Sequence, residues 1–347
     1  MADLIKGKNI LLVCYNLYEY HTAIRDALYE LGANYVHLKV ARYFPSSPRD
    51  DHFWSPWYRI PQRYFSAPHA RTEWTNQFIQ EIQGKSFDVL LVIENTAFKK
   101  SFIPYLKKAN PGIKTIWVLW DTFKTQQSLH RDYIPLFDKV VSFDRDDAKK
   151  YHLEYFPLFY LKPYGENKHT YDICYIGYAD IGGTSYRIDF ISKLKKQSDA
   201  LGLKSFYYVR CNKITVQNPL KKIFRKLFPY KHNQYIDSHI HEGYIHKQSL
   251  PLEQFGEIMR DSDIVVDINH SGRQGLTMNA ILGIVSGKKL ITTNYRVVDE
   301  DFYHPNNILV VDENNPVIPL SFVQSKTVHR DMSYLKLDNW LKHIINM

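Results

Sequence analysis

The chain has 347 residues, which is enough for two domains of ordinary size with a hydrophobic core each. Hydrophobic residues make up 44% of it, a share that excludes an intrinsically disordered protein. The formal net charge of +9 favours an acidic partner, such as a nucleic acid, an anionic lipid or a phosphorylated substrate.

The cysteines and the apolar runs indicate the cellular compartment in which the protein works. Cys14, Cys174 and Cys211 are scattered and odd in number, which predicts reduced core thiols rather than a disulfide framework or a zinc site. Residues 1–16 lack the pattern of a signal peptide, and no apolar run approaches the ~20 residues of a membrane span. We therefore expect a cytoplasmic protein that is soluble or peripheral to a membrane.

The N-terminal half alternates predicted strands and helices. Residues 9–15 (NILLVCY) form a continuous apolar run, as expected for a strand buried on both faces of a parallel sheet. Residues 41–75 are rich in Pro, Arg and aromatic residues and predict a long irregular insertion. Asp146 is expected to cap a helix that runs through Tyr151. The other predicted strands lie at 35–40, 89–93, 115–120 and 139–143, and the other helices at 21–31, 75–83 and 102–109.

The second half repeats this scheme. A predicted strand at 172–176 leads into a Gly-rich turn at 177–184, and a helix at 185–201 and a strand at 205–210 follow. A later helix is expected at 252–259, and residues 334–345 form an amphipathic helix. We expect domains at 1–160 and 170–330, with 331–347 packing back on the N-terminal domain.

The most informative stretch is 263–294. It predicts a strand (263–268), a polar Gly-bearing loop (269–275), a helix (276–285) and a second strand (290–293). A Gly-containing loop that opens a helix can aim free backbone N–H groups and the positive end of the helix dipole at an anion. Arg273 and Gln274 lie in this loop, where they could add a charge and an amide to a diphosphate. The alternative is an ordinary βαβ unit without a ligand.

Residues 219–232 combine lysines and arginines with apolar side chains. On a helix, one apolar face flanked by cations would be formed by Leu220, Ile223, Phe224, Leu227 and Phe228. This pattern is typical of a helix that lies in an anionic membrane interface, and the alternative is a helix packed on its own domain. No recognition motif for nucleic acid accompanies the charge, so we expect no nucleic-acid partner.

Two successive doubly wound halves, a Gly-rich turn and a late loop–helix segment together resemble GT-B glycosyltransferases. The likeness is closest to bacterial GT-B-like proteins of lipopolysaccharide and capsule assembly, and it rests on 117–123 (WVLWDTF), 137–160 and 275–294. The resemblance implies an α/β fold with two Rossmann-like domains that face each other across a cleft. It also implies that the second domain binds the nucleotide sugar and the first domain binds the acceptor.

The resemblance assigns residues to the donor nucleotide. Phosphate contacts are implied on one side for Gly182, Gly183 and Thr184, and on the other for Arg273, Gln274, Gly275, Leu276 and Thr277. Further nucleotide contacts are expected from Arg187, His246 and Lys247. Many retaining GT-B enzymes hold the ribose with a Glu where this chain has Leu282, and Asn279, one turn earlier, is the candidate substitute.

Three residues are candidates for the general base that an inverting transfer needs. In a parallel α/β sheet such a group belongs at the carboxyl end of a strand. Asp121 and Glu94 each follow an apolar strand directly, and His21, with Glu19 two residues before it, opens the first helix. Asp121 is preferred. The alternatives are a turn or N-cap carboxylate for Asp121 and a helix residue without chemistry for His21, and a retaining mechanism needs no such base.

The leading hypothesis is a hexosyl- or deoxyhexosyltransferase that uses a lipopolysaccharide, capsule or other glycan acceptor. It would be cytoplasmic and peripheral at the inner membrane, held there by residues 219–232. No metal or other cofactor is expected, because the nucleotide sugar is a co-substrate and two short acidic pairs are interpreted as turns and caps. The alternatives are a catalytically inactive nucleotide- or glycan-binding protein and a sugar-nucleotide epimerase.

Overall fold

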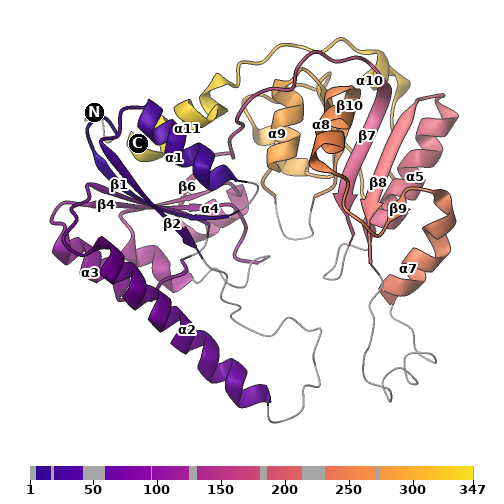
Figure 1. Cartoon of the computed structure of the whole chain (residues 1–347). Coiled ribbons are helices and arrows are strands. Elements are labelled where there is room, and N and C mark those ends of the chain that lie inside the picture. The colour runs from indigo at the N-terminus through magenta and orange to yellow at the C-terminus, as the bar shows by residue number, and fades with distance from the viewer. Residues whose placement is uncertain are drawn as a thin grey trace. The chain divides into compact units, whose positions relative to one another are not determined.

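The computed structural model describes residues 5–16, 19–41, 59–94, 96–124, 131–179, 186–212, 231–269 and 274–346. The chain divides into two compact units, Met1–Phe159 with Ser333–Met347 (unit 1) and Tyr160–Met332 (unit 2). Each unit contains a six-stranded parallel sheet with helices packed on it (Figure 1). The predicted class, α/β with two Rossmann-like domains, is confirmed.

Unit 1 has the strand order β2-β1-β3-β4-β5-β6. Its elements are β1 (Asn9–Tyr15), α1 (Tyr20–Glu30), β2 (Tyr35–Ala41), α2 (Arg59–Ile82), β3 (Val89–Ile93), α3 (Phe102–Ala109), β4 (Lys114–Leu119), η2 (Arg131–Leu136), β5 (Lys139–Ser142), α4 (Arg145–Tyr151), β6 (Glu154–Tyr155), η5 (Ser333–Leu335) and α11 (Leu337–Asn346). The chain passes from β1 to β2 on one side and then to β3 on the other, which creates a topological switch point between β1 and β3.

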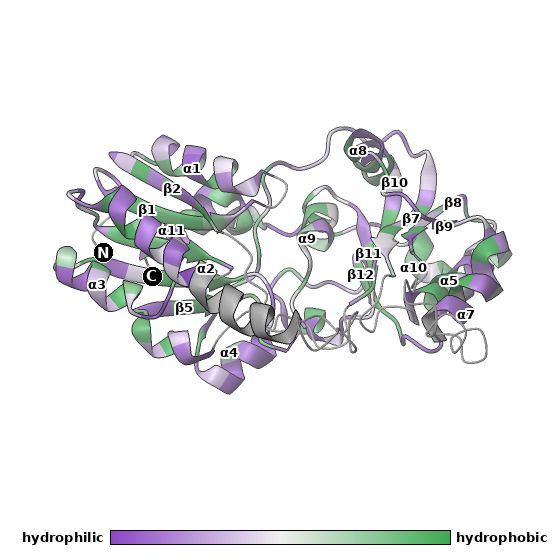
Figure 2. Cartoon of the chain, turned by 60° about the horizontal axis from the view of Figure 1, so that its bottom comes forward, coloured by the Kyte–Doolittle hydropathy of each residue, from purple (hydrophilic) through white to green (hydrophobic). Residues whose placement is uncertain are grey.

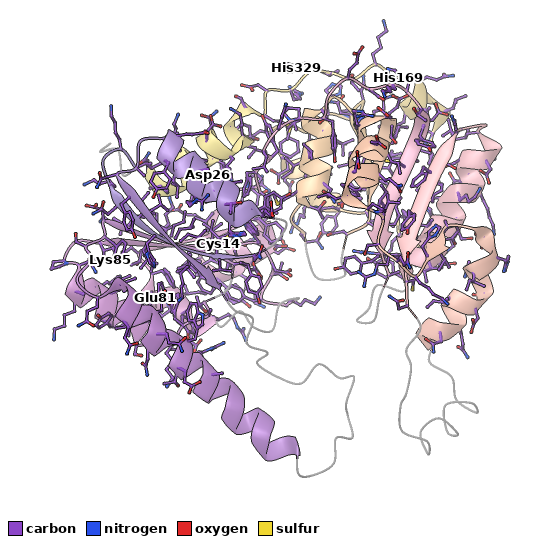
Figure 3. The ribbon with its side chains drawn as sticks, viewed as in Figure 1. Cys14, Asp26, Glu81, Lys85, His169 and His329 are labelled. Carbon is purple, nitrogen blue, oxygen red and sulfur yellow. The ribbon has the colours of Figure 1, made fainter. Side chains whose placement is uncertain are left out.

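The core of unit 1 follows from its apolar strands. Every residue of β3 is buried, and in β1 only the two end residues are partly exposed. Cys14 of β1 lies in this core (Figure 3), and burial raises the pKa of its thiol to about 12. Helices α2 and α3 pack on one face of the sheet, and α1 and α11 lie on the other (Figure 1).

Helix α11 joins unit 1 although it comes last in the chain. Its buried side chains include Trp340, whose indole Nε1 donates a hydrogen bond to the carbonyl of Pro157 at 2.9 Å. Lys139 of β5 donates to the carbonyl of Ile344 at 2.7 Å. The helix is therefore held by its apolar face, by a hydrogen bond that Trp340 donates and by one that Ile344 accepts.

Two sequence predictions in unit 1 need correction. Residues 59–75 belong to α2 rather than to an irregular insertion; Pro61 lies in the first helical turn, where a missing N–H costs little. Trp74, Phe78 and Ile82, four residues apart, anchor the helix in the core. The cap of α4 is Asp144 rather than Asp146, because the Asp144 carboxylate accepts from the N–H groups of Asp146 and Asp147, the second and third helical residues.

Unit 2 has the strand order β12-β11-β10-β7-β8-β9, which is the 3-2-1-4-5-6 order of dinucleotide-binding domains. Its elements are β7 (Tyr171–Tyr178), α5 (Tyr186–Ala200), β8 (Ser205–Arg210), α7 (Lys231–His239), η3 (Ile240–Glu242), β9 (Ile245–His246), α8 (Leu252–Arg260), β10 (Ser262–Asp267), α9 (Met278–Val285), β11 (Lys289–Thr292), η4 (Tyr295–Asp299), β12 (Ile308–Val310) and α10 (Leu320–Gln324). The switch point of this sheet lies between β7 and β10.

The core of unit 2 also holds two buried lysines, one directly before β11 and one at its first position. Lys288 donates to the carbonyls of Arg260 and Ser262, and Lys289 donates to those of Phe322 and Val323. These hydrogen bonds compensate for burying the ammonium groups. Hydrophobic residues otherwise follow the strands and the inner helix faces (Figure 2). Among the described helices, none is both long and apolar enough to cross a bilayer.

Candidate functional site

At the switch point of unit 2, the two strands that precede the predicted phosphate-binding segments end side by side. Strands β7 and β10 are parallel neighbours, and their carboxyl ends lead into 180–185 and 270–273. Open α/β sheets bind ligands outside the carboxyl ends of the strands at such a point. Four predicted contacts, Gly182, Gly183, Thr184 and Arg273, lie outside the described residues, as does 213–230, and these remain predictions.

Arg187, in the first turn of α5, connects the two strand ends. Its guanidinium donates to the carbonyl of Tyr178 at 3.0 Å and to that of Ile268 at 2.9 Å. The Nε atom is buried without a hydrogen-bond partner, and within the described ranges the side chain forms no ion pair. The two carbonyl oxygens offset the cost of burying this cation. Because no carboxylate of the described residues pairs with it, its positive charge can still attract an anion at this place.

The segment from Gln274 to Thr277 is held against the end of β10. Thr277 caps α9 by accepting from the N–H of Ala280 at 3.1 Å, and its hydroxyl donates to Oδ1 of Asp267 at 3.0 Å. Asn294 donates to the carbonyl of Gln274 at 2.7 Å. Gly275 and Leu276 are buried, whereas Asn279 is exposed in the first turn of α9. The start of α9 therefore has a defined position beside Arg187.

Tyr178, at the end of β7, is a candidate that the sequence analysis missed. Its side chain is 56% exposed, and its ring centre lies 5.9 Å from the Arg187 guanidinium. A half-exposed aromatic ring at a switch point can stack on a base or a sugar. An aromatic residue at the carboxyl end of the first strand of this unit was the available signal.

His246 and Lys247 lie away from the switch point within the sheet. His246 ends β9, and β8 separates this strand from β7. The imidazole stacks on Tyr208 with ring centres 3.9 Å apart and planes 6° apart, and burial lowers its pKa. Lys247 follows it and is exposed. The structure thus brings Arg187 and Gln274–Thr277 together and places these two residues elsewhere.

In unit 1, Glu94 and Asp121 follow neighbouring strands at the carboxyl edge of the sheet, and His21 lies in the first turn of α1. Glu94 directly follows β3 with a left-handed φ of 70°. Its Oε2 accepts from the N–H of Trp120 at 2.9 Å, and its own N–H donates to Val118 at 2.7 Å. Glu94 therefore joins the ends of β3 and β4.

Asp121 and His21 differ in exposure. Asp121 is partly exposed just after β4. Its Oδ1 accepts from the N–H of Thr122 at 2.9 Å, so this carboxylate also stabilises the turn after the strand. His21 is only 9% exposed in the first turn of α1, and its Nδ1 is buried without a hydrogen-bond partner. The rings of Tyr20 and Trp120 lie 5.9 Å apart, which places the start of α1 beside the end of β4.

Further unpaired polar atoms lie at this edge. Oγ1 of Thr96, after β3, and Nε1 of Trp120, after β4, are buried and find no hydrogen-bond partner among the described residues. Glu19, before α1, also has a left-handed φ, of 60°. Such strain and unpaired polar atoms are rare in native structures and concentrate at functional sites. The edge therefore offers several hydrogen-bonding groups to a bound molecule.

Asp147, in the first turn of α4, is a second residue that the sequence analysis missed. Its Oδ2 accepts from the N–H of Phe123 at 2.9 Å, and burial raises the pKa of this carboxyl group. A buried carboxyl group with a raised pKa after a strand end is a candidate acid or base.

The short acidic pairs have structural partners. Asp144 caps α4, Asp261 pairs with Arg260 at 2.8 Å, and Asp263 pairs with His169 at 2.6 Å. In the part of the chain that the structure covers, no group of three or more His, Cys, Asp or Glu side chains is placed to hold a metal ion.

The sequence matches no known family and no curated protein. The fold does have counterparts. An alpha,alpha-trehalose-phosphate synthase (UDP-forming) from Burkholderia xenovorans, in complex with glucose-6-phosphate, aligns with a TM-score of 0.57 at 14% identity and covers 97% of this chain and 99% of that chain. The trehalose-6-phosphate protein from E. coli bound with UDP-2-fluoro glucose aligns with a TM-score of 0.54 at 10% identity, over 97% of this chain and 94% of that chain. The N-terminal domain of Candida albicans trehalose-6-phosphate phosphatase aligns with a TM-score of 0.52 at 9% identity, over 100% and 94%. With its two Rossmann-like units, the chain has the GT-B fold.

Proposed function

We propose that this chain is a glycosyltransferase that moves a sugar from a nucleotide-sugar donor to a glycan acceptor. The observation that carries the proposal is Arg187, a partly buried cation that pairs with no carboxylate among the described residues, at the switch point of the nucleotide-type sheet in unit 2. Two proteins of similar fold, solved with UDP-2-fluoro glucose and with glucose-6-phosphate, support it by analogy of fold alone.

The donor diphosphate would bind at the ends of β7 and β10. Arg187 and the start of α9, at Thr277, would stabilise the charge that develops on the leaving diphosphate. Tyr178 would stack on the base or the sugar. The Gly-rich turn and Arg273 complete this proposed set from the two segments that follow these strands.

Asp121 is the proposed base for an inverting transfer. Its carboxylate is partly exposed, so an acceptor hydroxyl can reach it, whereas one oxygen of Glu94 is already bound to the Trp120 N–H. His21 is the alternative base. We assign Glu94 a positioning role, because it holds the backbone directly before Asp121.

The acceptor would be a lipopolysaccharide, a capsular polysaccharide or another glycan at the inner membrane face. The basic apolar segment 219–232 supports this proposal by its composition. A catalytically inactive nucleotide- or glycan-binding protein is the runner-up.

A thermal-shift screen against UDP, GDP, dTDP, CMP and their sugars, without added metal, tests the donor site, because a ligand that binds only the folded state raises the melting temperature. One nucleotide should stabilise the protein selectively, and no shift with any of them would overturn the donor site. With that sugar nucleotide, Asp121→Asn should slow transfer about 100-fold or more and leave the nucleotide shift intact. Asp26→Asn, an exposed carboxylate on α1, is the matched control (Figure 3). A shift without turnover would support the inactive binding protein.

A further inference from the structure

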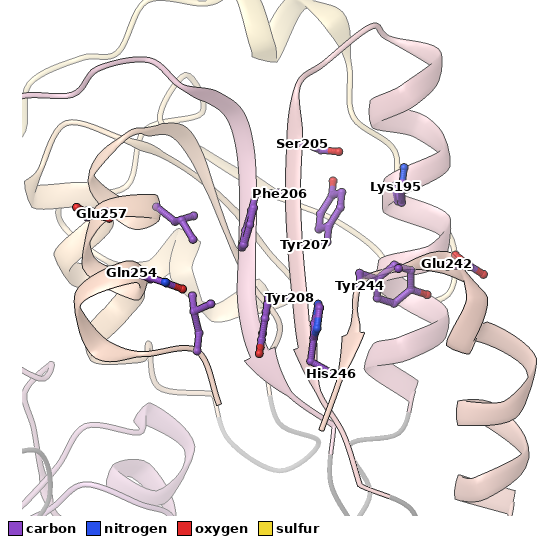
Figure 4. A pocket seen from close by; sticks show the side chains of 13 residues that line it. Lys195, Ser205, Phe206, Tyr207, Tyr208, Glu242, Tyr244, His246, Gln254 and Glu257 are labelled. Carbon is purple, nitrogen blue, oxygen red and sulfur yellow. The ribbon is translucent and has the colours of Figure 1, made fainter. Parts of the chain in front are cut away.

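A groove of about 680 Å³ lies at the edge of the unit 2 sheet, beside β8 (Figure 4). It is lined by one edge of β8, by Glu242–Tyr244, and by residues of α5 and α8. None of the switch-point residues, such as Arg187 or Thr277, contributes to it. The groove is therefore separate from the proposed donor site.

The groove lies where the edge of β8 is only partly paired with β9. Strand β9 pairs with β8 only at Val209 and Arg210. The N–H of Val209 donates to Tyr244 at 2.8 Å and that of Cys211 to His246 at 2.7 Å, so alternate N–H groups point to this side. By the same alternation, the N–H groups of Ser205 and Tyr207 point into the groove. Within the described chain no strand pairs with them.

The two walls hold side chains from opposite faces of the sheet. Tyr207 lies on the side of Lys195 and Glu242, whereas Phe206 and Tyr208 lie on the side of α8, near Gln254 (Figure 4). The empty space thus continues the plane of the sheet between two helices. The side chains on both sides would keep the edge of a second folded sheet from reaching β8, whereas a single extended segment could lie between them.

The aromatic side chains indicate what such a segment would carry. On β9, His246 stacks on Tyr208 at 3.9 Å. Phe206 lies on the same face, with its ring parallel to that of Tyr208 within 7°. It also contacts Tyr171 of β7, with ring centres 5.3 Å apart and planes tilted by 54°. Strand β9 does not extend far enough to cover Phe206. A segment that continued the line of β9 would place an apolar or aromatic side chain on it.

The charges along the groove favour a basic segment. The Lys195 ammonium already pairs with Asp199 at 2.7 Å. Glu257 is exposed and forms no ion pair within the described ranges. Glu242, 23% exposed in its side chain, lies 3.9 Å from the His239 imidazole and accepts from the Ser192 hydroxyl. Among the charged side chains that line the groove in the described ranges, the one without a pairing partner is therefore the acidic Glu257.

We propose that this groove binds an extended peptide segment of a partner protein as an added strand beside β8. The backbone of the segment would pair with Ser205 and Tyr207. An apolar side chain would cover Phe206, and basic side chains would lie near Glu242 and Glu257. The proposal does not depend on the proposed transferase activity.

The probe is the fluorescein-labelled hexapeptide Lys-Val-Lys-Phe-Lys-Val, acetylated and amidated, added to the full chain. Its fluorescence anisotropy should rise saturably, and hydrogen exchange should slow at the amides of Ser205 and Tyr207. The same peptide with alternate backbone nitrogens methylated keeps its side chains but cannot pair as a strand, so we expect at least tenfold weaker binding. No saturable binding, equal binding of the methylated peptide, or no slowing at these two amides would overturn the proposal.

A pair of variants separates strand pairing from side-chain contact. Ser205→Pro removes an N–H that points into the groove, and proline is tolerated at the first residue of an edge strand. It should weaken peptide binding at least tenfold, whereas Ser205→Ala should bind as the wild type does. Glu257→Lys, which leaves the backbone unchanged, should also weaken binding. If a maltooligosaccharide protects the same amides and the peptide does not, the groove is a glycan site and the proposal fails.

Discussion

Replacing Arg187 with Met removes the cation at the unit 2 switch point while keeping a long side chain. If a phosphate charge lies about 5 Å from the guanidinium, the attraction is ~3 kcal/mol at an effective dielectric constant of ~20. This free energy corresponds to a loss of roughly 100-fold in nucleotide affinity. The variant also loses the hydrogen bonds to Tyr178 and Ile268, at 3.0 and 2.9 Å, but it no longer buries a charge. The change in folding stability should therefore be smaller than the change in affinity.

Titration calorimetry with the nucleoside diphosphate selected by the thermal-shift screen measures this loss. Lys193→Met is the matched control, because it removes the same charge from α5 at a side chain that is 41% exposed and paired with Asp189. Salt and water screen such a charge, so we expect a change of less than about threefold. Binding of the free nucleoside should be unaffected by either substitution. If folded Arg187→Met binds the diphosphate within about threefold of the wild type, the switch-point site is refuted.

Three further predictions concern stability, each measured by urea unfolding. Gly177→Ala would place a Cβ atom 2.6 Å from Cζ of Tyr175 and should cost about 1–3 kcal/mol. Gly283→Ala, inside α9, would place its Cβ atom 3.5–3.9 Å from side-chain atoms of Val265, which is ordinary van der Waals contact, and should stabilise by roughly 0.5–1 kcal/mol. Equal effects would contradict this packing. The unfolded Cys14 thiol loses its proton near pH 9, whereas the folded thiol keeps it up to about pH 12. The free energy of unfolding should therefore fall by about 1.4 kcal/mol per pH unit between pH 9 and 12, and Cys14→Ala should abolish this part of the pH dependence. Trp340→Phe should cost about 1–3 kcal/mol, because it leaves a buried backbone carbonyl unpaired, and an unchanged midpoint would show that the indole hydrogen bond adds nothing.

The strands were predictable because their signal is local. Residues 89–93 and 102–109 fold as the sequence predicts, since a buried parallel strand needs a continuous apolar run and a helix needs a 3.6-residue period. Helix α2 was not predictable over its first half, because Pro61 and the polar residues around it indicate a loop. Its course depends on contacts such as Phe78 against Phe102, with ring centres 4.8 Å apart, and such contacts come from distant parts of the chain.

The candidate site was predictable only where the residue type and its place after a strand coincide. Asp121 and Glu94 follow apolar runs directly, so their place at the sheet edge could be inferred. The unpaired atoms of Thr96 and Trp120 could not, because burial without a partner is a property of the folded packing. The distance of His246 from the switch point depends on the order of the strands in the sheet, and a local sequence pattern does not determine that order.

The return of α11 to unit 1 has a consequence for the order in which the chain folds during synthesis. Residues 160–332 form unit 2 and leave the ribosome before the residues that complete unit 1. Until the final turns emerge, the surface on α1 and around Phe159 that Trp340 covers stays open to water and to chaperones. Unit 1, which precedes unit 2 in the chain, is thus completed only after the residues of unit 2 have been made.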